Sequence, residues 1–400
     1  MVFVEDLMQF GRAAKLRALA AARFATARLL AGKARPQDTA AIIFSSGSTG
    51  DPKGVMLTHA NLLANIDSVS QLFDMGAGDC MLGALPFFHS FGFTYTLWYP
   101  LLHGACSVFH PNPMDGKIIG ELAGRYKATF FISTPTFCLN YLRHCTREQF
   151  ASLRYLLVGA EKMRPALAEA FTEKFGITPL EGYGCTEMGP VVAVNRPDVT
   201  ASNPPQIANR AGSVGRPIPG VVARVVNPET MDALPVGEAG LLLVTGPSRM
   251  AGYVADPEKT SAALHDGFYN TGDIARLDED GFLYIVDRLA RMSKIGGEMV
   301  PHLKVEEAIA AAVHHTPCLV VGIPDEQRGE RLVALYTAAD VTPAQLYEHL
   351  AGNGLPPLWI PKRENFYQVD AIPALGTGKA DLREARRIAQ ERAGECVGQR

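Results

Sequence analysis

The sequence predicts an α/β protein that carries a β-barrel-like subdomain and ends in a small, separate α+β domain. Between residues 39 and about 210, apolar runs that suit strands alternate with helical segments, an order typical of a largely parallel sheet. From about 212 to 287, short strand-like runs lie between glycine and proline turns, which indicates a small β-subdomain. From about 290 to 400 the order helix, strand and helix indicates a second domain.

Individual elements follow from apolar runs and from periodicity. Short apolar runs predict strands at 42–44, 130–133, 154–158, 223–226, 240–244, 283–286 and 318–321. The first of these, Ile42 to Phe44, is expected to be buried. Helical spacing predicts a helix that starts near Thr58 or His59 and further helices at 165–175, 305–313 and 342–352.

The composition excludes several classes of protein. The chain of 400 residues is long enough for two or more domains, and its hydrophobic content of 47% is that of a globular protein. A net charge of −3 argues against nucleic acid as a partner. The seven cysteines contain no C-x-x-C pair, so zinc spacing and a disulfide framework are both missing, and we expect a cytoplasmic protein.

Two stretches raise the question of a membrane. Residues 80–114 carry no Asp, Glu, Lys or Arg, but prolines and histidines interrupt them, and the helix expected at 91–102 is too short to cross a bilayer. Between residues 5 and 35, seven basic residues stand against two acidic ones in an Ala/Leu-rich stretch of helical character. Such a segment either contacts the anionic inner face of the cytoplasmic membrane or is a solvated face packed on the domain, and we favour the second interpretation.

The stretch from Ser45 to Lys53, which reads SSGSTGDPK, points to a phosphate. Its glycines let the backbone turn sharply and approach a ligand, consecutive N–H groups can converge on phosphate oxygens, and Lys53 adds positive charge. It is not a Walker A motif, because residue 52 is proline and residue 54 is glycine. A flexible polar loop is the alternative interpretation.

Two further motifs, GAEKM at 159–163 and LEGYGCTEMG at 180–189, each follow an apolar run. We therefore expect them at carboxyl ends of strands, where open α/β sheets bind ligands. The second motif contains an aromatic ring, Tyr183, and a carboxylate, Glu187. Cys185 has no base nearby in the sequence and is interpreted as a packing residue.

The last third of the chain contributes YNTGD at 269–273, DRLARMSKIGG at 287–297 and PALGTGKADLR at 373–383. In order and at similar intervals, the motifs of the chain resemble those of the adenylate-forming enzymes. This superfamily contains acyl-CoA synthetases, luciferases and the adenylation domains of peptide synthetases. The resemblance implies an AMP-forming acid–thiol ligase that uses ATP and Mg²⁺.

The resemblance also implies a role for individual residues. The phosphates of ATP would be bound by Ser45, Ser46, Gly47, Ser48, Thr49, Gly50 and Lys53. Adenine and ribose would lie against Gly159, Ala160, Glu161, Gly182, Tyr183, Gly184, Asp273 and Arg288. The catalytic residues would be Lys379, Thr186, Glu187 and His89. Among them, Glu187 would ligate Mg²⁺, Thr186 would bind the α-phosphate and Lys379 would carry the first half-reaction. His89 would stand at the gate near the substrate carboxylate.

The same resemblance implies the domain organisation. Residues 1–35 would be a basic helical remnant of a first subdomain, 36–287 the large AMP-binding domain, 288–294 the hinge and 295–400 a mobile small domain. The hinge and the channel for the thiol would involve Ala290, Lys294, Gly296 and Gly297. Many relatives carry Asp where this chain has Ala290, and Gly where it has Asp287. The fold is expected to be N-terminally incomplete, because such enzymes have a substantial segment before the phosphate loop.

The stretch 85–102, LPFFHSFGFTYTLWYPLL, is apolar and aromatic, which favours a fatty acyl chain as substrate. This stretch and the segment SKIGGEMVPH at 293–302 look like the ligase part of bacterial fused acyltransferase/acyl-[acyl-carrier-protein] synthetases. That likeness implies acyl carrier protein as the thiol partner and a fused or separate acyltransferase. Coenzyme A is the alternative thiol. Two alternative functions are kept. One is a kinase or hydrolase, which the missing Walker A motif disfavours, and the other is a truncated binding module without full activity.

Overall fold

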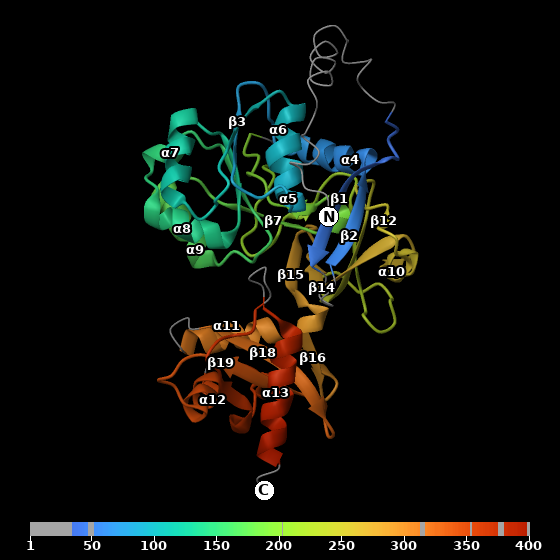
Figure 1. The fold of residues 1–400 in the computed structure, drawn as a ribbon, viewed down its shortest axis with the longest axis vertical. Helices are drawn as coiled ribbons and strands as arrows, with labels where there is room; N and C mark the ends of the chain where they lie inside the picture. Colours follow the sequence, from blue (N-terminus) through green and yellow to red (C-terminus); the bar gives the residue numbers. More distant parts are fainter. Residues whose placement is uncertain are drawn as a thin grey trace, which may run out of the picture.

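A computed structural model describes residues 34–46, 52–201, 203–312, 317–352, 354–374 and 380–397. Figure 1 shows a large α/β domain joined through β14 and β15 to a smaller domain drawn in orange and red. The predicted segment 5–32, residues Gly47 to Gly50, the side chain of Ser46 and Lys379 lie outside the described residues. No helix in the described ranges is long and apolar enough to cross a membrane.

The large domain is built on a seven-stranded sheet with the strand order β4-β3-β5-β6-β7-β8-β9. The neighbours from β4 to β7 run parallel, and β8 and β9 are antiparallel additions. This confirms the prediction of a largely parallel sheet. The strands are β3 (Cys80–Gly83), β4 (Cys106–Phe109), β5 (Phe130–Ser133), β6 (Tyr155–Val158), β7 (Leu180–Gly184), β8 (Val191–Val194) and β9 (Arg216–Pro217).

Helices cover both faces of this sheet because its strands carry apolar side chains on both sides. Phe131 and Leu156 pack on α7 (Gly116–Tyr126), α8 (Pro135–His144) and α9 (Pro165–Phe175). Their neighbours Phe130 and Leu157 point to the opposite face. That face is covered by α4 (His59–Ser70) and by a continuous helical stretch made of α5 (Ser90–Gly92), a π-helical segment (Phe93–Trp98) and α6 (Tyr99–Leu102).

Local sequence determines where these helices begin. The hydroxyl of Thr58 accepts a hydrogen bond from the N–H of Asn61 at 3.1 Å, and the Asn61 side chain accepts one from the N–H of Thr58 at 3.0 Å. This capping box satisfies two backbone donors and starts α4 where the sequence predicts. In α5, a Cβ on Gly92 would lie 2.2 Å from the carbonyl oxygen of Pro86. Only glycine therefore lets this helix follow so closely behind β3.

Two antiparallel sheets form the β-subdomain and share one core, in which Val55 and Leu57 meet Leu242 and Val244. The five-stranded sheet contains β10 (Val222–Val226), β11 (Gly240–Thr245), β13 (Leu264–His265), β14 (Phe268–Leu277) and β15 (Leu283–Arg288). The three-stranded sheet contains β1 (Thr39–Ser46), β2 (Pro52–Thr58) and β12 (Gly252–Tyr253), and α10 (Pro257–Ala262) follows β12.

The first strand differs from its prediction. Only Ile43 of the run 42–44 is buried, whereas Ile42 is 47% and Phe44 68% exposed. The prediction of a buried strand is wrong because β1 is an edge strand whose alternate side chains face outward. The sequence also gave no sign of β2, in which Lys53 lies directly opposite Ser45. Lys53 is therefore held on a strand.

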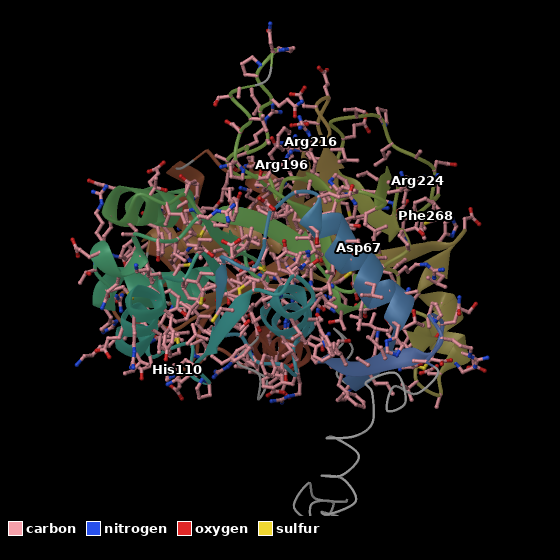
Figure 2. The ribbon with its side chains drawn as sticks, turned by 90° about the horizontal axis from the view of Figure 1, so that it is seen from above. Asp67, His110, Arg196, Arg216, Arg224 and Phe268 are labelled. Atoms are coloured by element: carbon pink, nitrogen blue, oxygen red, sulfur yellow. The ribbon has the colours of Figure 1, made fainter. Side chains whose placement is uncertain are left out.

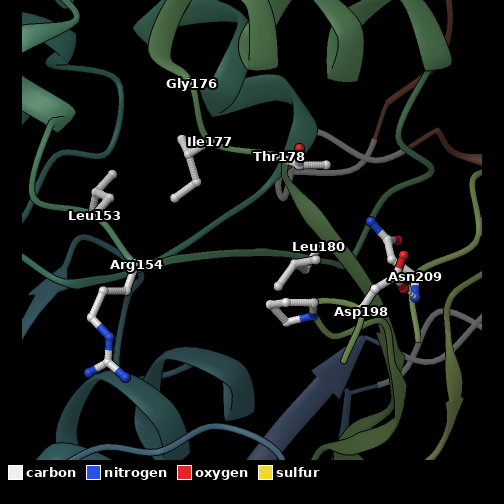
Figure 3. A pocket seen from close by; sticks show the side chains of 9 residues that line it. Leu153, Arg154, Gly176, Ile177, Thr178, Leu180, Asp198 and Asn209 are labelled. Atoms are coloured by element: carbon white, nitrogen blue, oxygen red, sulfur yellow. Dashed lines mark hydrogen bonds between the residues drawn. The ribbon is translucent and has the colours of Figure 1, made fainter. Parts of the chain in front are cut away.

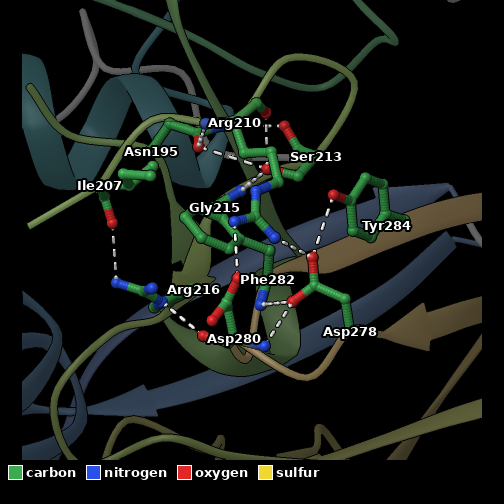
Figure 4. A network of polar contacts seen from close by, with 10 residues as sticks. All are labelled: Asn195, Ile207, Arg210, Ser213, Gly215, Arg216, Asp278, Asp280, Phe282 and Tyr284. Carbon is green, nitrogen blue, oxygen red and sulfur yellow. Dashed lines mark hydrogen bonds and ion pairs between the residues drawn. The ribbon is translucent and has the colours of Figure 1, made fainter. Parts of the chain in front are cut away.

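A network of polar contacts fixes the turn between β14 and β15 against the edge of the large sheet (Figure 4). Arg210 donates to Asp278 and to Asp280, each at 2.7 Å. The guanidinium groups of Arg210 and Arg216 lie 4.3 and 4.2 Å from the ring centroid of Phe282. A similar contact supports the five-stranded sheet, since the Arg224 guanidinium lies 4.5 Å from the centroid of the Phe268 ring. Both residues are labelled in Figure 2.

The small domain has its own sheet and its own core, as the sequence predicts. Its strand order is β17-β16-β19-β18, with β20 paired to β19. The strands are β16 (Met292–Ile295), β17 (Glu298–Pro301), β18 (Cys318–Asp325), β19 (Gly329–Tyr336) and β20 (Phe366–Gln368). One face packs on α11 (His302–Ala312) and α12 (Pro343–Gly352), and the other on α13 (Leu382–Val397).

Candidate functional site

The loops that follow β6 and β7 meet at the carboxyl edge of the parallel sheet. Gly159 comes directly after β6, and a Cβ on it would lie 3.3 Å from the carbonyl oxygen of Gly182 and 3.5 Å from the ring of Phe91. Glycine at position 159 therefore allows the two loops and the start of α5 to approach closely. This edge is where ligands bind in open α/β sheets.

Residues at the start of the helical stretch 90–102 reach the same edge. Ser90 is buried, and its Oγ lies 3.2 Å from Oγ1 of Thr186. His89 is the N-terminal cap of α5, and its Nδ1 accepts a hydrogen bond from the N–H of Phe91 at 3.3 Å. The structure thus brings His89 next to the segment that contains Thr186, although the two are far apart in the sequence.

The loop of residues 159–163 is held on both sides. Ala160 has a φ of +68°, a value that non-glycine residues adopt rarely. The carboxylate of Glu161 accepts hydrogen bonds from the N–H and the hydroxyl of Thr136, at 3.2 and 2.6 Å. The N–H of Met163 donates to Oε2 of Glu181 at 3.2 Å. These contacts make the loop a fixed wall of the site.

Asp273 links the large sheet to the β-subdomain. The Tyr183 hydroxyl donates to Oδ2 of Asp273, and Nε of Arg288 lies 3.2 Å from Oδ1. Asp273 and Arg288 are also register partners on β14 and β15. Burial raises the pKa of the Asp273 carboxyl above its ordinary value, whereas the Arg288 charge and the Tyr183 hydrogen bond oppose that rise. The result is one carboxylate between an aromatic ring and a guanidinium group.

Glu187 links the large sheet to the three-stranded sheet. It is only 7% exposed, and its Oε1 accepts a hydrogen bond from the Tyr253 hydroxyl at 3.0 Å. Nζ of Lys53 lies 5.3 Å from the centroid of the same Tyr253 ring. Lys53 and Glu187 therefore contact the same tyrosine, one over its ring and the other at its hydroxyl.

Cys185 packs in the same hydrophobic cluster as Tyr183 and Tyr253, the partners of Asp273 and Glu187. Burial and the nearby charges of Glu187 and Asp273 raise the pKa of its thiol well above the ordinary value, and the Arg288 charge opposes them only in part. The thiol therefore remains protonated at neutral pH, so Cys185 has no thiolate character. Because Tyr183 and Tyr253 pack in one cluster, their partners Asp273 and Glu187 lie in the same region of the molecule.

The residues predicted for the hinge and the thiol channel make their contacts away from the residues predicted to bind the nucleotide. The N–H of Gly296 donates to the carbonyl of Arg328 at 2.9 Å, and Nε1 of Trp359 donates to Glu298 at 2.9 Å. The glycine turn of β16 and β17 therefore packs on its own domain. Lys294 pairs with Glu229 of the β-subdomain, and the Ala290 carbonyl accepts a hydrogen bond from Arg386 at 2.9 Å.

Sequence reasoning missed Ser90, Glu181 and Tyr253. Glu181 stands inside the motif LEGYG and is detectable as an acidic residue two positions before Tyr183. Ser90 directly follows His89 and carries no pattern of its own. Tyr253 reaches Glu187 only because β12 pairs with β2, where Tyr253 is opposite Val55. No local signal predicts a contact of this kind between distant segments.

A cavity of about 350 Å³ lies at the opposite edge of the large sheet (Figure 3). Residues that precede β6 and β7 line it, together with a loop after β8. Its two charged side chains already have partners, since Arg154 pairs with Asp79 at 2.7 Å and Asp198 accepts the N–H groups of Ala208 and Asn209. This cavity is separate from the residues that the motifs predict, and its charges need no ligand.

Glu181 provides a test of the site that does not depend on activity. Burial raises the pKa of its carboxyl from 4.5 to about 7, against the opposing effects of the Met163 N–H and the Lys162 charge. Between pH 4.5 and about pH 7, the folded state binds more protons than the unfolded state. The contribution of Glu181 to the free energy of unfolding therefore falls as the pH rises. We expect Glu181→Gln to raise the free energy of unfolding by about 1–3 kcal/mol at pH 8 and to change it little at pH 4. Chemical denaturation at both pH values measures this difference.

The exposed Glu173→Gln on α9 is the control for that experiment and should show no such difference between the two pH values. An equal effect of Glu181→Gln at pH 4 and pH 8 would contradict the assignment of a raised pKa to Glu181.

Comparison with known proteins connects this geometry to a family. Residues 7–254 match the family described as AMP-binding enzyme, and residues 304–379 match the AMP-binding enzyme C-terminal domain. A long-chain-fatty-acid–CoA ligase of Bacillus subtilis is 32% identical over 348 residues, which cover 86% of this chain and 60% of the relative. A feruloyl-CoA synthase of Amycolatopsis is 32% identical over 359 residues, covering 88% of this chain and 70% of the relative.

Solved structures agree with the sequence comparison. ATP-bound MatB from Rhodopseudomonas palustris superposes with a TM-score of 0.76 at 30% identity, covering 88% of this chain and 69% of that one. The o-succinylbenzoate CoA synthetase MenE of Bacillus subtilis, with ATP and magnesium, gives 0.76 at 25% identity, covering 88% and 70%. The chain thus spans 60 to 70% of the length of these relatives. It belongs to the AMP-binding, adenylate-forming enzymes related to acyl-CoA synthetases.

Proposed function

We propose that this protein activates a fatty acid with ATP to form an acyl-adenylate and then transfers the acyl group to a thiol. The observation that carries the proposal is that Asp273, through Tyr183, and Glu187, through Tyr253, are joined to one packed cluster, with Thr186 directly before Glu187. Thr186 and Glu187 follow β7, whereas Asp273 lies on β14, and each is of the type that one nucleotide requires. Tyr183 supplies an aromatic face for a base and Asp273 a carboxylate acceptor for ribose hydroxyls.

The phosphates of ATP would lie beside Thr186 and Lys53. Lys53, the motif residues Ser45 to Gly50 and the Thr186 hydroxyl supply positive charge and hydrogen-bond donors for them. Within the described residues, no cluster of three or more His, Cys, Asp or Glu could hold a metal. Glu187 nevertheless fits Mg²⁺, because this ion takes one or two carboxylates and completes its shell with water and substrate phosphates. When bound there, Mg²⁺ would neutralise phosphate charge.

The reaction follows from the charges of the substrates. A carboxylate is a poor electrophile, so its oxygen first attacks the α-phosphorus of ATP, and pyrophosphate leaves. A thiol then attacks the carbonyl carbon of the mixed anhydride, and AMP leaves. Both reactants of the first step are anionic, so the protein must align them and offset their repulsion. Thr186, Lys53 and Lys379 are the residues we propose for that task.

An apolar acid suits the surroundings of His89. Phe87 and Phe88, which directly precede it, are 44% and 81% exposed, and the Phe87 ring lies 5.4 Å from that of Phe109. No Asp, Glu, Lys or Arg occurs between residues 80 and 114 to bind a charged group on the substrate. Several relatives are named as long-chain-fatty-acid–CoA ligases, which supports a fatty acid as the substrate class.

For the thiol we propose phosphopantetheine, the group that coenzyme A and acyl carrier protein share. The relatives named above support coenzyme A, whereas the likeness of SKIGGEMVPH to acyl-[acyl-carrier-protein] synthetases supports the carrier protein. An acyltransferase partner stays a prediction, and contact of residues 5–32 with a membrane stays the less favoured alternative to packing on the domain. In the second step, the small domain would move about residues 288–294 to admit the thiol.

The decisive measurement is fatty-acid-dependent exchange of labelled pyrophosphate into ATP. We expect exchange with a long-chain acid, AMP as the nucleotide product, and thioester formation when a thiol is added. Assays with coenzyme A and with acyl carrier protein side by side identify the acceptor. Formation of ADP instead of AMP would indicate a kinase or hydrolase and overturn the proposal. Nucleotide binding without any exchange would indicate a binding module.

A further inference from the structure

One ion pair joins the wall of the candidate nucleotide site to the small domain. Nζ of Lys162, in the loop 159–163, donates to Oε1 of Glu307 on α11 at 2.9 Å. The side chains are 45% and 44% exposed, so the pair is accessible to solvent. Although burial opposes it, the hydrogen bond and charge of Lys162 lower the pKa of Glu307, which keeps this carboxylate ionised.

The loop that carries Lys162 is rigid. On one side Glu161 is tied to Thr136, and on the other Met163 is tied to Glu181. A lysine whose backbone is already held by its neighbours loses less backbone entropy when its ammonium group is bound. The same charge acts on Glu181 within the site and on Asp287 at the end of β15, because it opposes the rise in the pKa of both carboxyls.

The pair between Lys162 and Glu307 forms in one particular orientation of the small domain relative to the large domain. In Figure 1, α13 begins at the end of the small domain that lies nearest the large domain. Ala380, which directly follows Lys379, precedes this helix and forms a bridge with Ala374. The N–H of Gly296 instead donates to the carbonyl of Arg328, and the neighbouring Glu298 accepts from Trp359, both within the small domain. This arrangement suits the first half-reaction, in which Lys379 is proposed to act.

We infer that Lys162 is a positioning residue: through Glu307 it holds the small domain over the nucleotide for adenylate formation, and the pair breaks before the thiol step. This inference rests on the proposed function. The pair does not act alone, because Lys294 and Glu229 also join the domains. Loss of Lys162 should therefore lower the population of this orientation of the small domain without removing it.

The experiment compares Lys162→Glu, Glu307→Lys and the double charge swap. Lys304→Glu is the matched control, because Lys304 pairs with the same Glu307 at 3.2 Å but from within α11. Acid-dependent pyrophosphate exchange and thioester formation from pre-formed acyl-adenylate are measured separately. We expect each single reversal to slow exchange about fivefold, to leave the thioester step unchanged or faster, and to be rescued by the swap.

A measurement of domain orientation makes the outcome independent of catalysis. Fluorophores attached through azido-phenylalanine at the exposed positions Leu139 and Gln390, one in each domain, report the inter-domain distance by energy transfer. We expect Lys162→Glu to broaden this distance distribution and the swap to restore it. An unchanged distribution, equal loss of both half-reactions, or the same effect from Lys304→Glu would overturn the inference. Absence of exchange in the unaltered protein would refute the proposed function, while the distance measurement still decides the role of Lys162.

Discussion

Lys379→Ala is expected to slow adenylate formation by about two to three orders of magnitude, because removal of one preorganised donor at a developing charge costs that much. The attack of a carboxylate on the α-phosphate of ATP gathers negative charge that the motif lysine would offset. The flanking residues Ala374 and Ala380 are joined by a β-bridge, and the N–H of Asp381 donates to the carbonyl of Pro373 at 2.9 Å. The substitution should therefore leave the fold intact.

Pyrophosphate exchange measures the first half-reaction for this variant, and hydrolysis or thiolysis of supplied acyl-adenylate measures the second. The second should change little, since Lys379 is assigned to the first step alone. Lys362→Ala is the matched control, because this exposed lysine lies in the same domain outside the motif. Exchange at a near-normal rate in Lys379→Ala would refute the assigned role.

Arg291→Met is expected to destabilise the small domain by about 3–5 kcal/mol at pH 8, the usual cost of removing one partner from a buried ion pair. Nη2 of Arg291 lies 2.5 Å from Glu306, and its Nε lies 3.9 Å from Asp287. The side chains of these carboxylates are only 12% and 3% exposed. Burial raises the pKa of both carboxyls, and the Arg291 charge opposes that rise. Without arginine, both carboxylates stay buried and, among the residues described, accept hydrogen bonds from backbone N–H donors alone, from Val320 for Glu306 and from Arg288 and Leu303 for Asp287.

The pH dependence of this effect has a defined sign. In Arg291→Met the folded-state pKa values of Glu306 and Asp287 rise further above their unfolded values. The loss of stability is then largest above the folded pKa values and shrinks as acid protonates both groups. Denaturant titrations at pH 8 and pH 5 measure the difference. The control Arg363→Met removes an exposed pair with Glu348 and should cost less than about 1 kcal/mol. A loss for Arg291→Met no larger than this control would rule out a structural role of the buried pair.

The helices and strands of the large sheet could be predicted because each depends on local sequence. The helix at 165–175 agrees with α9, and the strand at 130–133 agrees with β5. Thr58 and Asn61 identify the start of α4 through side chains three residues apart. The strand at 42–44 was assigned to the wrong environment, because apolar residues alone do not distinguish an edge strand from a central one.

The candidate site could be predicted only as separate motifs. The composition of the stretch 45–53 points to Lys53 by itself, whereas the roles of Tyr183, Glu187 and Asp273 are implied by the resemblance of their motifs to adenylate-forming enzymes. Neither the motifs nor the resemblance gave a sign of the Tyr253 hydroxyl that binds Glu187, or of the Lys162–Glu307 pair, in which the two residues lie 145 positions apart. Contacts between distant segments depend on strand pairing and domain packing, which no local pattern encodes.

By itself, the sequence determined the α/β class, the separate small domain and the chemical character of each motif, because these depend on periodicity and on the functional groups present. Only the tertiary structure decided that Tyr183 meets Asp273, that Lys53 stands on a strand opposite Ser45, and that Lys162 reaches the small domain. The reason is physical: burial and strand register set the distances between side chains, and these distances determine which charges offset one another.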